Sequence, residues 1–355
     1  MVTLILLGLL LLPVLLVAGG MALFLKGKRR SILIWAGVIY LILILVVFLG
    51  VGPYAAAWSI AHAGTRLQDR QLKDTPAQLN VSYEDIIFEA RDSLKLSGWL
   101  IPPAGKNAII ICTHGLFRNR IEVLPRVLSF VKAGYGALLY DSRSHGLSAK
   151  GPVSLGYHER NDVLGAIQYV SRRFQDSVEQ PRIVLMGVSM GAMATLEAAA
   201  ETKDYDALIL DSPFASLQQT IVNHSWLWLK MPRYPLPSIF LFWFQRIAGF
   251  DPGRVNAHRA LTRILPVPLL IIASKGDQRM GIEVPQLLFQ ESKASIKELK
   301  FFGEDVTHGA AARIHPDAYS ALVLGFLERA LARPDRVENE DPSVTSTSGI
   351  ADSQR

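Results

Sequence analysis

Two long apolar stretches dominate the first part of the chain. Residues 2–25 and 31–65 contain no Asp, Glu, Lys or Arg, and four basic residues lie between them: Lys26, Lys28, Arg29 and Arg30. Each stretch holds at least the roughly 20 apolar residues that cross the hydrocarbon core of a bilayer. The pattern predicts two transmembrane helices within residues 1–62, which would form a hairpin in the cell membrane.

A cleaved signal peptide is the alternative interpretation of the first stretch. No basic residue precedes it, and its apolar run is longer than the roughly 7–15 residues of a signal peptide, so a membrane helix is favoured. Basic connections tend to stay in the cytoplasm, which predicts that everything after about residue 60 is extracytoplasmic. Arg66, Arg70 and Lys73 oppose this orientation, and Asp69 and Asp74 partly balance them.

Beyond residue 80, short β-type runs alternate with helical patterns. This alternation is typical of a mostly parallel sheet with crossover helices. Strands are expected at 81–88, 94–101, 108–113, 136–140, 181–186, 207–210, 268–273 and 296–302. Helices are expected at about 120–133, 158–174, 192–200 and 316–332. The sequence therefore predicts an α/β domain over 81–332, joined to the membrane helices by a linker at 63–80.

Residues 214–264 interrupt this alternation and are rich in Trp, Phe, Leu and Pro. The segments 226–229 and 239–244 are unusually apolar. A helical lid is expected here. It could be a cap that buries its rings on the domain, or it could be functional, as an acyl-binding wall or as a surface that touches the bilayer. Residues 333–355 are polar, with almost no large apolar side chain, which predicts a disordered tail.

The segment Gly187-Val188-Ser189-Met190-Gly191 lies between an expected strand and a run of good helix formers. A strand that turns sharply into a helix needs residues without a side chain on both sides of the bend. The residue at the apex would present its hydroxyl at a helix N-terminus, as in a G-x-S-x-G nucleophile elbow. Ser189 is therefore the candidate nucleophile.

A serine nucleophile needs a base, and the base needs an orienting acid. His308 is the best candidate base, because it follows the last strand in a loop that contains Gly303 and Gly309. The other histidines lie near the membrane, in the insert, at helix starts or on early loops: His62, His114, His145, His158, His224, His258 and His315. On the early loops, His114 and His145 are expected to brace turns.

Asp277 and Asp211 each end a strand that precedes the His308 loop, so either carboxylate could orient the base. Asp277 is favoured because the preceding glycine allows a tight turn, and the other would then be a turn or cap residue. An oxyanion needs two N–H donors. The backbone N–H groups of Met190, at the start of the elbow helix, and of Leu116, after the third strand, are the candidates.

Taken together, these residues resemble the α/β-hydrolase superfamily, and more narrowly its serine-aminopeptidase and monoacylglycerol-lipase-like branch of membrane-anchored proteins. The resemblance covers about residues 80–332 and rests on several ordered motifs: 96–100 (Leu-Ser-Gly-Trp-Leu), 113–115 (Thr-His-Gly), 141–148 (Asp-Ser-Arg-Ser-His-Gly-Leu-Ser), the elbow, 211–215 (Asp-Ser-Pro-Phe-Ala), Asp277 and 308–309 (His-Gly). It implies an eight-stranded, mostly parallel sheet and the order Ser189, Asp277, His308 for nucleophile, acid and base. Ser144 departs from the usual glycine, and residues 278–281 depart from the usual small or apolar residues with Val-Pro.

Composition narrows the functional classes further. The net charge is +6, but no basic block is interleaved with aromatic residues, so nucleic-acid binding is not expected. The single cysteine, Cys112, excludes an intramolecular disulfide and is expected to be buried.

The sequence predicts a membrane-anchored serine hydrolase that cleaves carboxylic esters, with acyl or lipid-like substrates favoured. Catalysis would proceed through an acyl-enzyme on Ser189, without a metal or organic cofactor. A thioesterase, a peptidase or a catalytically silent interaction module remain alternatives.

Overall fold

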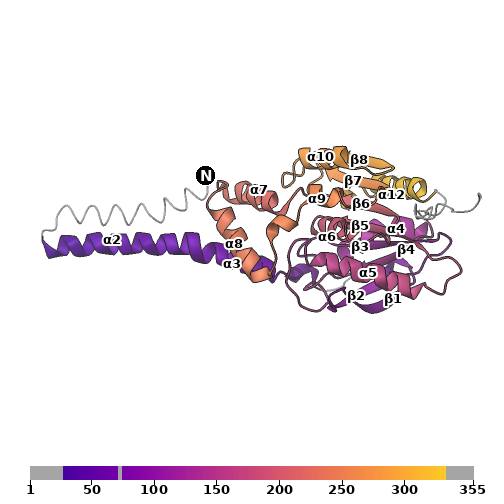
Figure 1. Cartoon of the computed structure of the whole chain (residues 1–355), viewed down its shortest axis with the longest axis horizontal. Helices are drawn as coiled ribbons and strands as arrows, with labels where there is room; N and C mark the ends of the chain where they lie inside the picture. Colours follow the sequence, from indigo (N-terminus) through magenta and orange to yellow (C-terminus); the bar gives the residue numbers. More distant parts are fainter. Residues whose placement is uncertain (1–26, 71–73, 333–355) are drawn as a thin grey trace, which may run out of the picture.

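A twisted sheet forms the centre of the molecule, and its eight strands lie in the order β1-β2-β4-β3-β5-β6-β7-β8 (Figure 1). The structure is a computed structural model that describes residues 27–70 and 74–332. The strands are β1 Glu84–Glu89, β2 Lys95–Ile101, β3 Ala108–Thr113, β4 Gly136–Tyr140, β5 Arg182–Val188, β6 Ala207–Asp211, β7 Leu269–Ser274 and β8 Lys297–Phe302. Strand β2 is antiparallel to both of its neighbours, and all other pairs are parallel. The predicted mostly parallel sheet is confirmed.

The predicted strand limits hold for β3 and β4, whereas β1 begins three residues later than expected. Residues Pro76–Leu79 form a 3-10 turn that ends at Asn80, which has a φ of 55°. The N–H of Val81 donates to the carbonyl of Pro76, so the chain is still turning where the sequence pattern predicts a strand.

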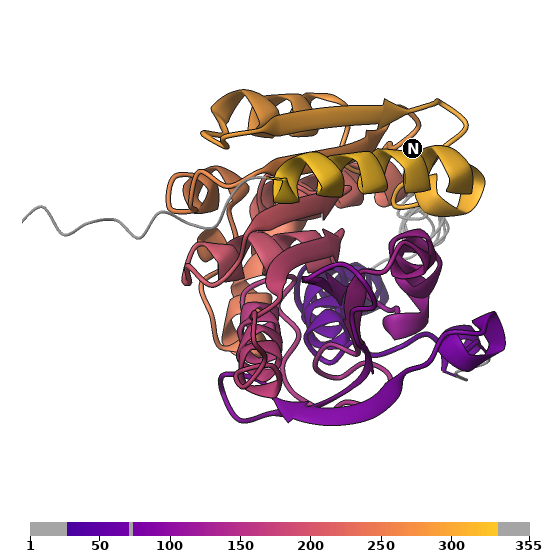
Figure 2. The ribbon, with the colours of Figure 1, turned by 90° about the vertical axis from the view of Figure 1, so that its right-hand side faces the viewer.

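Helices cover both faces of the sheet (Figure 2). Ile109 and Ile111 of β3 pack with α5 (Glu159–Arg173) and α6 (Met190–Ala199), whereas Ile110 and Cys112 pack with α4 (Leu124–Lys132) and α12 (Pro316–Leu331). This alternation follows from the period of two in a strand, and it explains why β3 is apolar throughout. Cys112 is buried, as expected.

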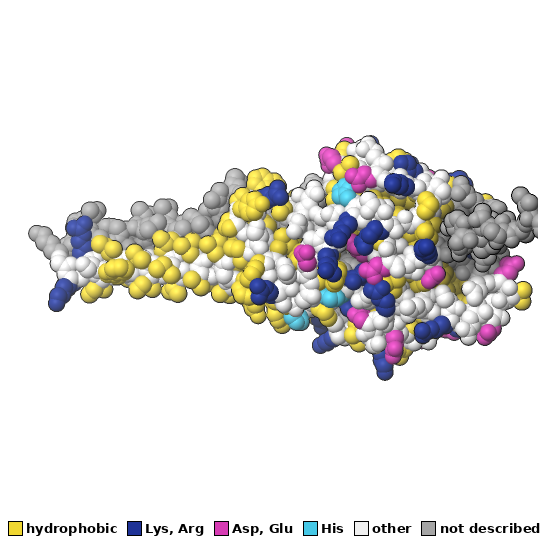
Figure 3. Space-filling view, in the orientation of Figure 1, with side chains coloured by type: hydrophobic (Ala, Val, Ile, Leu, Met, Phe, Trp, Pro, Cys, Tyr) yellow, Lys and Arg dark blue, Asp and Glu magenta, His cyan; other side chains and the backbone are white. Residues whose placement is uncertain are grey.

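A single long helix precedes the domain and is built from α2 (Lys28–Val46), a π-helical turn (Val47–Val51) and α3 (Gly52–Ala61). Within the described residues it is the one helix long and apolar enough to cross a membrane. Its apolar side chains are exposed along α2, with Lys or Arg side chains at the far end (Figure 3). The other predicted span, 2–25, lies outside the described residues, so the described residues contain one such helix and no hairpin. The predicted tail, 333–355, also lies outside them.

Residues 61–66, at the end of this helix, are hydrogen-bonded to the domain. The carbonyl of Ala61 accepts from Val153 N–H, and Arg66 N–H donates to the carbonyl of Phe117. The hydroxyl of Thr65 donates to the carbonyl of Arg118 at 2.9 Å and accepts from Gly146 N–H at 2.7 Å. These contacts fix the end of the helix against the loops that follow β3 and β4.

The insert contains α7 (Leu217–Leu229), α8 (Leu236–Ala248) and the short helix α9 (Ala257–Leu261). Helix α8 packs against α3, with the rings of Tyr54 and Trp243 edge to face at 5.2 Å. The helices α3, α7 and α8 lie together at the end of the domain from which α2 projects (Figure 1). Helix α10 (Glu283–Glu291), which the sequence pattern did not predict, connects β7 to β8.

Candidate active site

Ser189 lies at the sharp turn between β5 and α6, with φ 54° and ψ −113°. Positive φ is unfavourable for a residue with a side chain, and such strain persists only where the surroundings impose it. Here the surroundings are two close backbone approaches: a Cβ on Gly187 would lie 2.2 Å from the carbonyl oxygen of Gly191, and a Cβ on Gly191 would lie 2.2 Å from that of Thr113. Both flanking glycines are therefore required by the packing of the turn.

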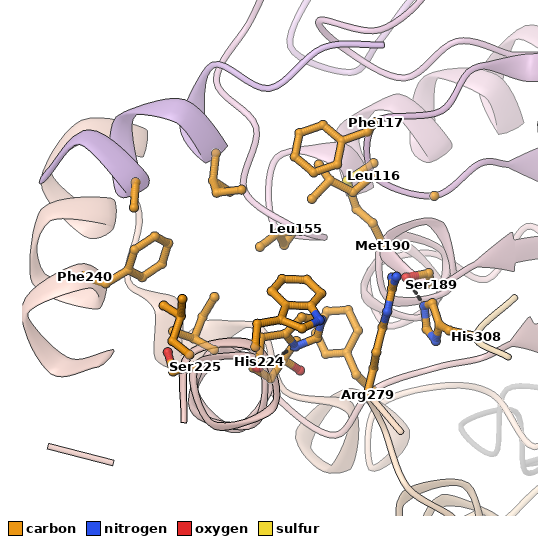
Figure 4. A pocket seen from close by; sticks show the side chains of 18 of the residues that line it. Leu116, Phe117, Leu155, Ser189, Met190, His224, Ser225, Phe240, Arg279 and His308 are labelled. Carbon is orange, nitrogen blue, oxygen red and sulfur yellow. Dashed lines mark hydrogen bonds between the residues drawn. The ribbon is translucent and has the colours of Figure 1, made fainter. Parts of the chain in front are cut away.

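The structure brings Ser189, His308 and Asp277 into one hydrogen-bonded chain (Figure 4 shows the Ser189–His308 contact). The Oγ of Ser189 lies 2.7 Å from Nε2 of His308, and Nδ1 of His308 lies 2.6 Å from Oδ2 of Asp277. The three residues come from the ends of β5, β7 and β8, which meet at the carboxyl edge of the parallel sheet.

Asp277 is buried and its surroundings stabilise the charged form. Burial raises the pKa of this carboxyl, but the hydrogen bond and charge of His308, together with two backbone hydrogen bonds, outweigh that effect, so the pKa lies below its ordinary value. The second oxygen, Oδ1, accepts from the N–H groups of Arg279 and Met280 at 2.9 and 3.3 Å. The departure from the family pattern at 278–281 thus still forms a tight turn that holds the carboxylate.

The candidate oxyanion donors lie close to Ser189 in the same pocket (Figure 4). Met190 N–H is at the start of α6, and Leu116 belongs to the loop after β3. Gly115 in that loop lies against the elbow, because a Cβ there would be 3.6 Å from Cβ of Ser189. Within residues 27–70 and 74–332, neither Leu116 N–H nor Met190 N–H has an intramolecular acceptor. Both donors are therefore free to bind a ligand oxygen.

The amides beside Leu116 are already occupied. Gly115 N–H donates to Oε2 of Glu122 at 2.7 Å, and Phe117 N–H donates to Nε2 of His145 at 3.2 Å. His114 accepts from Ser142 N–H at 2.9 Å. His114 and His145 therefore brace the two early loops, as the sequence indicates.

Asp211, the alternative candidate acid, is engaged elsewhere. Its Oδ2 lies 3.2 Å from Nε of Arg126 and accepts from the hydroxyl of Tyr319 at 3.0 Å. Ser212 Oγ donates to Oδ1 of Asp211 at 3.0 Å and accepts from Gly309 N–H at 3.1 Å. Arg126 also donates to the carbonyl of Gly309 at 2.5 Å. Asp211 thus supports the loop that carries His308 and does not contact the imidazole.

The remaining histidines bond to other groups. The partners are the carbonyls of Trp58, Ala248 and Thr220 for His62, His158 and His224, and the carboxylates of Glu291 and Asp305 for His258 and His315. Of these, His224 also lines the pocket described below. None of them contacts Ser189 within the described part of the chain.

A pocket of about 720 Å³ opens beside Ser189 (Figure 4). Its walls come from the Leu116 loop, from α7 and α8, and from the long N-terminal helix. Mostly apolar side chains line it, with Ser189 and His308 on one side and Phe240 on the opposite side, next to α3. This volume is in the range of small-molecule sites.

Three charged residues that line this pocket were not singled out by the sequence: Arg118, Glu122 and Arg279. Glu122 is its single carboxylate among the described residues; burial raises its pKa, which the nearby Arg126 partly offsets. Arg279 also lines the pocket, and its guanidinium lies 5.6 Å from the ring of Trp228. No carboxylate in the described residues forms an ion pair with Arg279. The only signal in the sequence for a charged residue in the pocket was the departure from the family pattern at 278–281, which includes Arg279.

No group of three or more His, Cys, Asp or Glu side chains within the described ranges could hold a metal ion.

Comparisons with known proteins agree with the fold. The sequence model of the family described as serine aminopeptidase, S33, matches residues 104–246. The uncharacterised protein YqkD of Bacillus subtilis is 27% identical over 258 residues, which cover 68% of this chain and 82% of that protein. The α/β-hydrolase domain-containing protein WAV2 of Arabidopsis thaliana is 29% identical over 176 residues, covering 48% and 51% of the two chains.

Among solved structures, the esterase Pf2001 of Pyrococcus furiosus is similar, with a TM-score of 0.62 and 26% identity. The alignment covers 76% of this chain and 98% of the esterase. Sheet order, elbow and sequence similarity point to one conclusion: the chain belongs to the α/β-hydrolase superfamily and has the fold of a hydrolase.

Proposed function

We propose that this protein is a membrane-anchored serine hydrolase that cleaves carboxylic esters through an acyl-enzyme on Ser189. The observation that carries the proposal is the continuous hydrogen-bonded chain from Ser189 through His308 to Asp277, with contacts of 2.7 and 2.6 Å. A serine hydroxyl is a weak nucleophile, and a chain of this kind is what makes it reactive.

The roles of the residues then follow from their positions. Nε2 of His308 accepts the Ser189 proton as Oγ attacks the ester carbonyl, while the Asp277 carboxylate accepts a hydrogen bond from Nδ1 and stabilises the imidazolium. The N–H groups of Leu116 and Met190 donate to the oxyanion. His308 returns the proton to the leaving alcohol. Water, activated by the same imidazole, then releases the acid from Ser189.

Two observations favour an ester over a peptide with a free N-terminus. The pocket is largely apolar, and its carboxylate, Glu122, already accepts from Gly115 N–H and lies 3.4 Å from Arg118. It is therefore not a ready partner for a substrate ammonium group. The similar protein from P. furiosus is an esterase.

The membrane assignment rests on the helix Lys28–Ala61, which is about 51 Å long at 1.5 Å per residue and exceeds a hydrocarbon core of about 30 Å. Its exposed apolar surface over α2 is suited to lipid. The basic residues at its start would remain in the cytoplasm, which puts the hydrolase domain on the extracytoplasmic side.

Labelling with a fluorophosphonate probe tests the proposal, because such probes react with activated serines. Wild-type protein is expected to label and Ser189→Ala is not. Ser225→Ala is the matched control, since Ser225 lines the same pocket without contacting His308, and it should label like wild type. Equal labelling of wild type and Ser189→Ala would exclude the proposed mechanism.

A further inference from the structure

The pocket beside Ser189 extends to the long N-terminal helix. Its lining includes Val47 and Phe48 from the π-helical turn, and Gly52, Ala56 and Ile60 from α3. Helix α8 packs against α3 and closes the far side of the pocket through Phe240. The helix proposed to anchor the protein is therefore also one wall of the cavity that contains the candidate nucleophile.

The position of this wall along the helix matters. Lys28, Arg29 and Arg30 mark one boundary of the bilayer, so the hydrocarbon core begins near Ser31. Phe48 is 17 residues further on, about 26 Å along the helix, which is still within a core of about 30 Å. Gly52, Ala56 and Ile60 lie beyond this depth, at the interface with the domain. The wall therefore runs from the edge of the hydrocarbon towards Ser189.

The face that α3 presents to the pocket is small at two positions, Gly52 and Ala56. Gly52, Ala56 and Ile60 are spaced by four residues and share one side of the helix. The buried residues Pro53, Ala57 and Ala61 form the adjacent side, which packs against the protein, and Pro53 also lines the pocket. Small residues at positions 52 and 56 leave room in the pocket that larger side chains would fill.

The lid beside this wall has the composition of a membrane interface. Trp226, Trp228 and Tyr234 are more than half exposed. The lid carries Lys230, Arg233 and Arg246, and no Asp or Glu occurs between Asp211 and Asp251. Exposed aromatic rings together with basic side chains are typical of protein surfaces at the headgroup level of a bilayer. The same end of the domain carries α3, so helix and lid would meet the membrane together.

We propose that the anchoring helix forms part of the substrate site: long-chain acyl esters enter the pocket laterally from the bilayer, along the face of Phe48, Gly52 and Ala56, with the acyl chain against this helix and the ester at Ser189. This inference rests on the proposed hydrolase function and adds the substrate class and the route of access. Ala56 then limits the length of chain that the pocket accepts.

The test compares two substitutions on neighbouring residues of the full-length protein in phosphatidylcholine vesicles that contain phosphatidylglycerol. Ala56→Trp fills the pocket, whereas Ala55→Trp adds the same ring at an exposed position that does not line it. The substrates are p-nitrophenyl butyrate and p-nitrophenyl palmitate. Exclusion of even two methylenes is worth roughly tenfold, so Ala56→Trp should lower the palmitate-to-butyrate ratio of kcat/KM by at least about tenfold. Ala55→Trp should leave that ratio within about twofold of wild type.

The remaining outcomes are equally informative. The inference is overturned if Ala56→Trp and Ala55→Trp change the ratio alike, or if the wild-type protein cleaves butyrate but not palmitate. If Ala56→Trp loses both activities through misfolding, Ala56→Leu replaces it, and an unchanged ratio for that variant also overturns the inference. Absence of wild-type hydrolysis of either ester, without fluorophosphonate labelling, instead refutes the proposed function itself.

Discussion

Nδ1 of His308 lies 2.6 Å from Oδ2 of Asp277, while Asp211, which ends the neighbouring strand, bonds to Arg126 and Tyr319 instead. Two carboxylates at adjacent strand ends thus have different surroundings. One is positioned to orient a base, and the other holds the loop on which that base lies. This difference leads to two contrasting predictions.

Asp277→Asn should abolish most of the activity and leave the protein folded. An amide in place of the carboxylate no longer favours the Nδ1–H tautomer or stabilises the imidazolium, which costs on the order of 10⁴-fold in kcat. Steady-state hydrolysis of p-nitrophenyl butyrate measures the loss, and thermal unfolding in detergent checks the fold. A variant with near wild-type kcat would show that Asp277 is not the orienting acid.

Asp211→Asn should lower the stability of the protein more than its activity. Removing one partner of a buried ion pair leaves Arg126 uncompensated and costs roughly 3–5 kcal/mol of stability. The unfolding midpoint should fall by several degrees. Protein that remains folded at low temperature should keep most of its kcat, because Asp211 does not contact His308. If activity disappeared without a loss of stability, the assigned roles of the two aspartates would have to be exchanged.

Stability should fall with acid because of His145. Burial, followed by the nearby His114, lowers the pKa of His145 to about 4 from its ordinary 6.5. Between these values the unfolded chain binds the extra proton, so the folded state loses stability as the pH falls from about 6.5 towards 4. From pH 7.5 to pH 5 the loss is about 2 kcal/mol.

Denaturant unfolding at these two pH values measures this loss. His145→Gln should be less stable than wild type at pH 7.5 and should show a shallower pH dependence. Some dependence should remain, because burial also lowers the pKa of His114. Equal stability of wild type at both pH values would contradict the neutral, buried state of His145.

Arg279 should favour substrates that carry a negative charge. It lines the same pocket as Ser189 and forms no ion pair with a carboxylate of the described residues. A charge-assisted hydrogen bond contributes about 1.5–3 kcal/mol, so Arg279→Gln should lower kcat/KM for a succinate monoester by about tenfold or more. Activity on the neutral diester, in which the free carboxylate of the same substrate is methylated, should change by less than about threefold. An identical effect on both esters would rule out a role in charge recognition.

Much of the sheet could be predicted from the sequence. Short runs that are apolar at every position, such as 108–113 and 136–140, are typical of strands in a parallel sheet that is covered by helices on both faces. The elbow could be predicted for a similar reason, since Gly187 and Gly191 flank a residue between a strand and a helix. Motif comparison did not show whether Ser144 could replace the usual glycine in its turn. Ser144 adopts a φ of 64°, as the usual glycine would, and its hydroxyl bonds to both the carbonyl and the N–H of Gly151.

Other features depend on contacts that the sequence does not encode locally. The pairing of Asp211 with Arg126 joins residues 85 positions apart, so strand patterns alone left both aspartates as candidates. The apolar composition of residues 31–65 predicts a membrane helix, but it does not show which face of that helix contacts the lid. The contribution of Gly52 and Ala56 to the pocket therefore appears only once α3 and α8 are packed together.

Mass spectrometry of the protein quenched in acid during turnover of p-nitrophenyl butyrate would detect an acyl-enzyme on Ser189. We expect a butyryl adduct on the peptide that contains Ser189. Ser189→Ala should carry no adduct and should not hydrolyse the ester. An adduct on another residue, or hydrolysis by Ser189→Ala at the wild-type rate, would contradict an acyl-enzyme on Ser189.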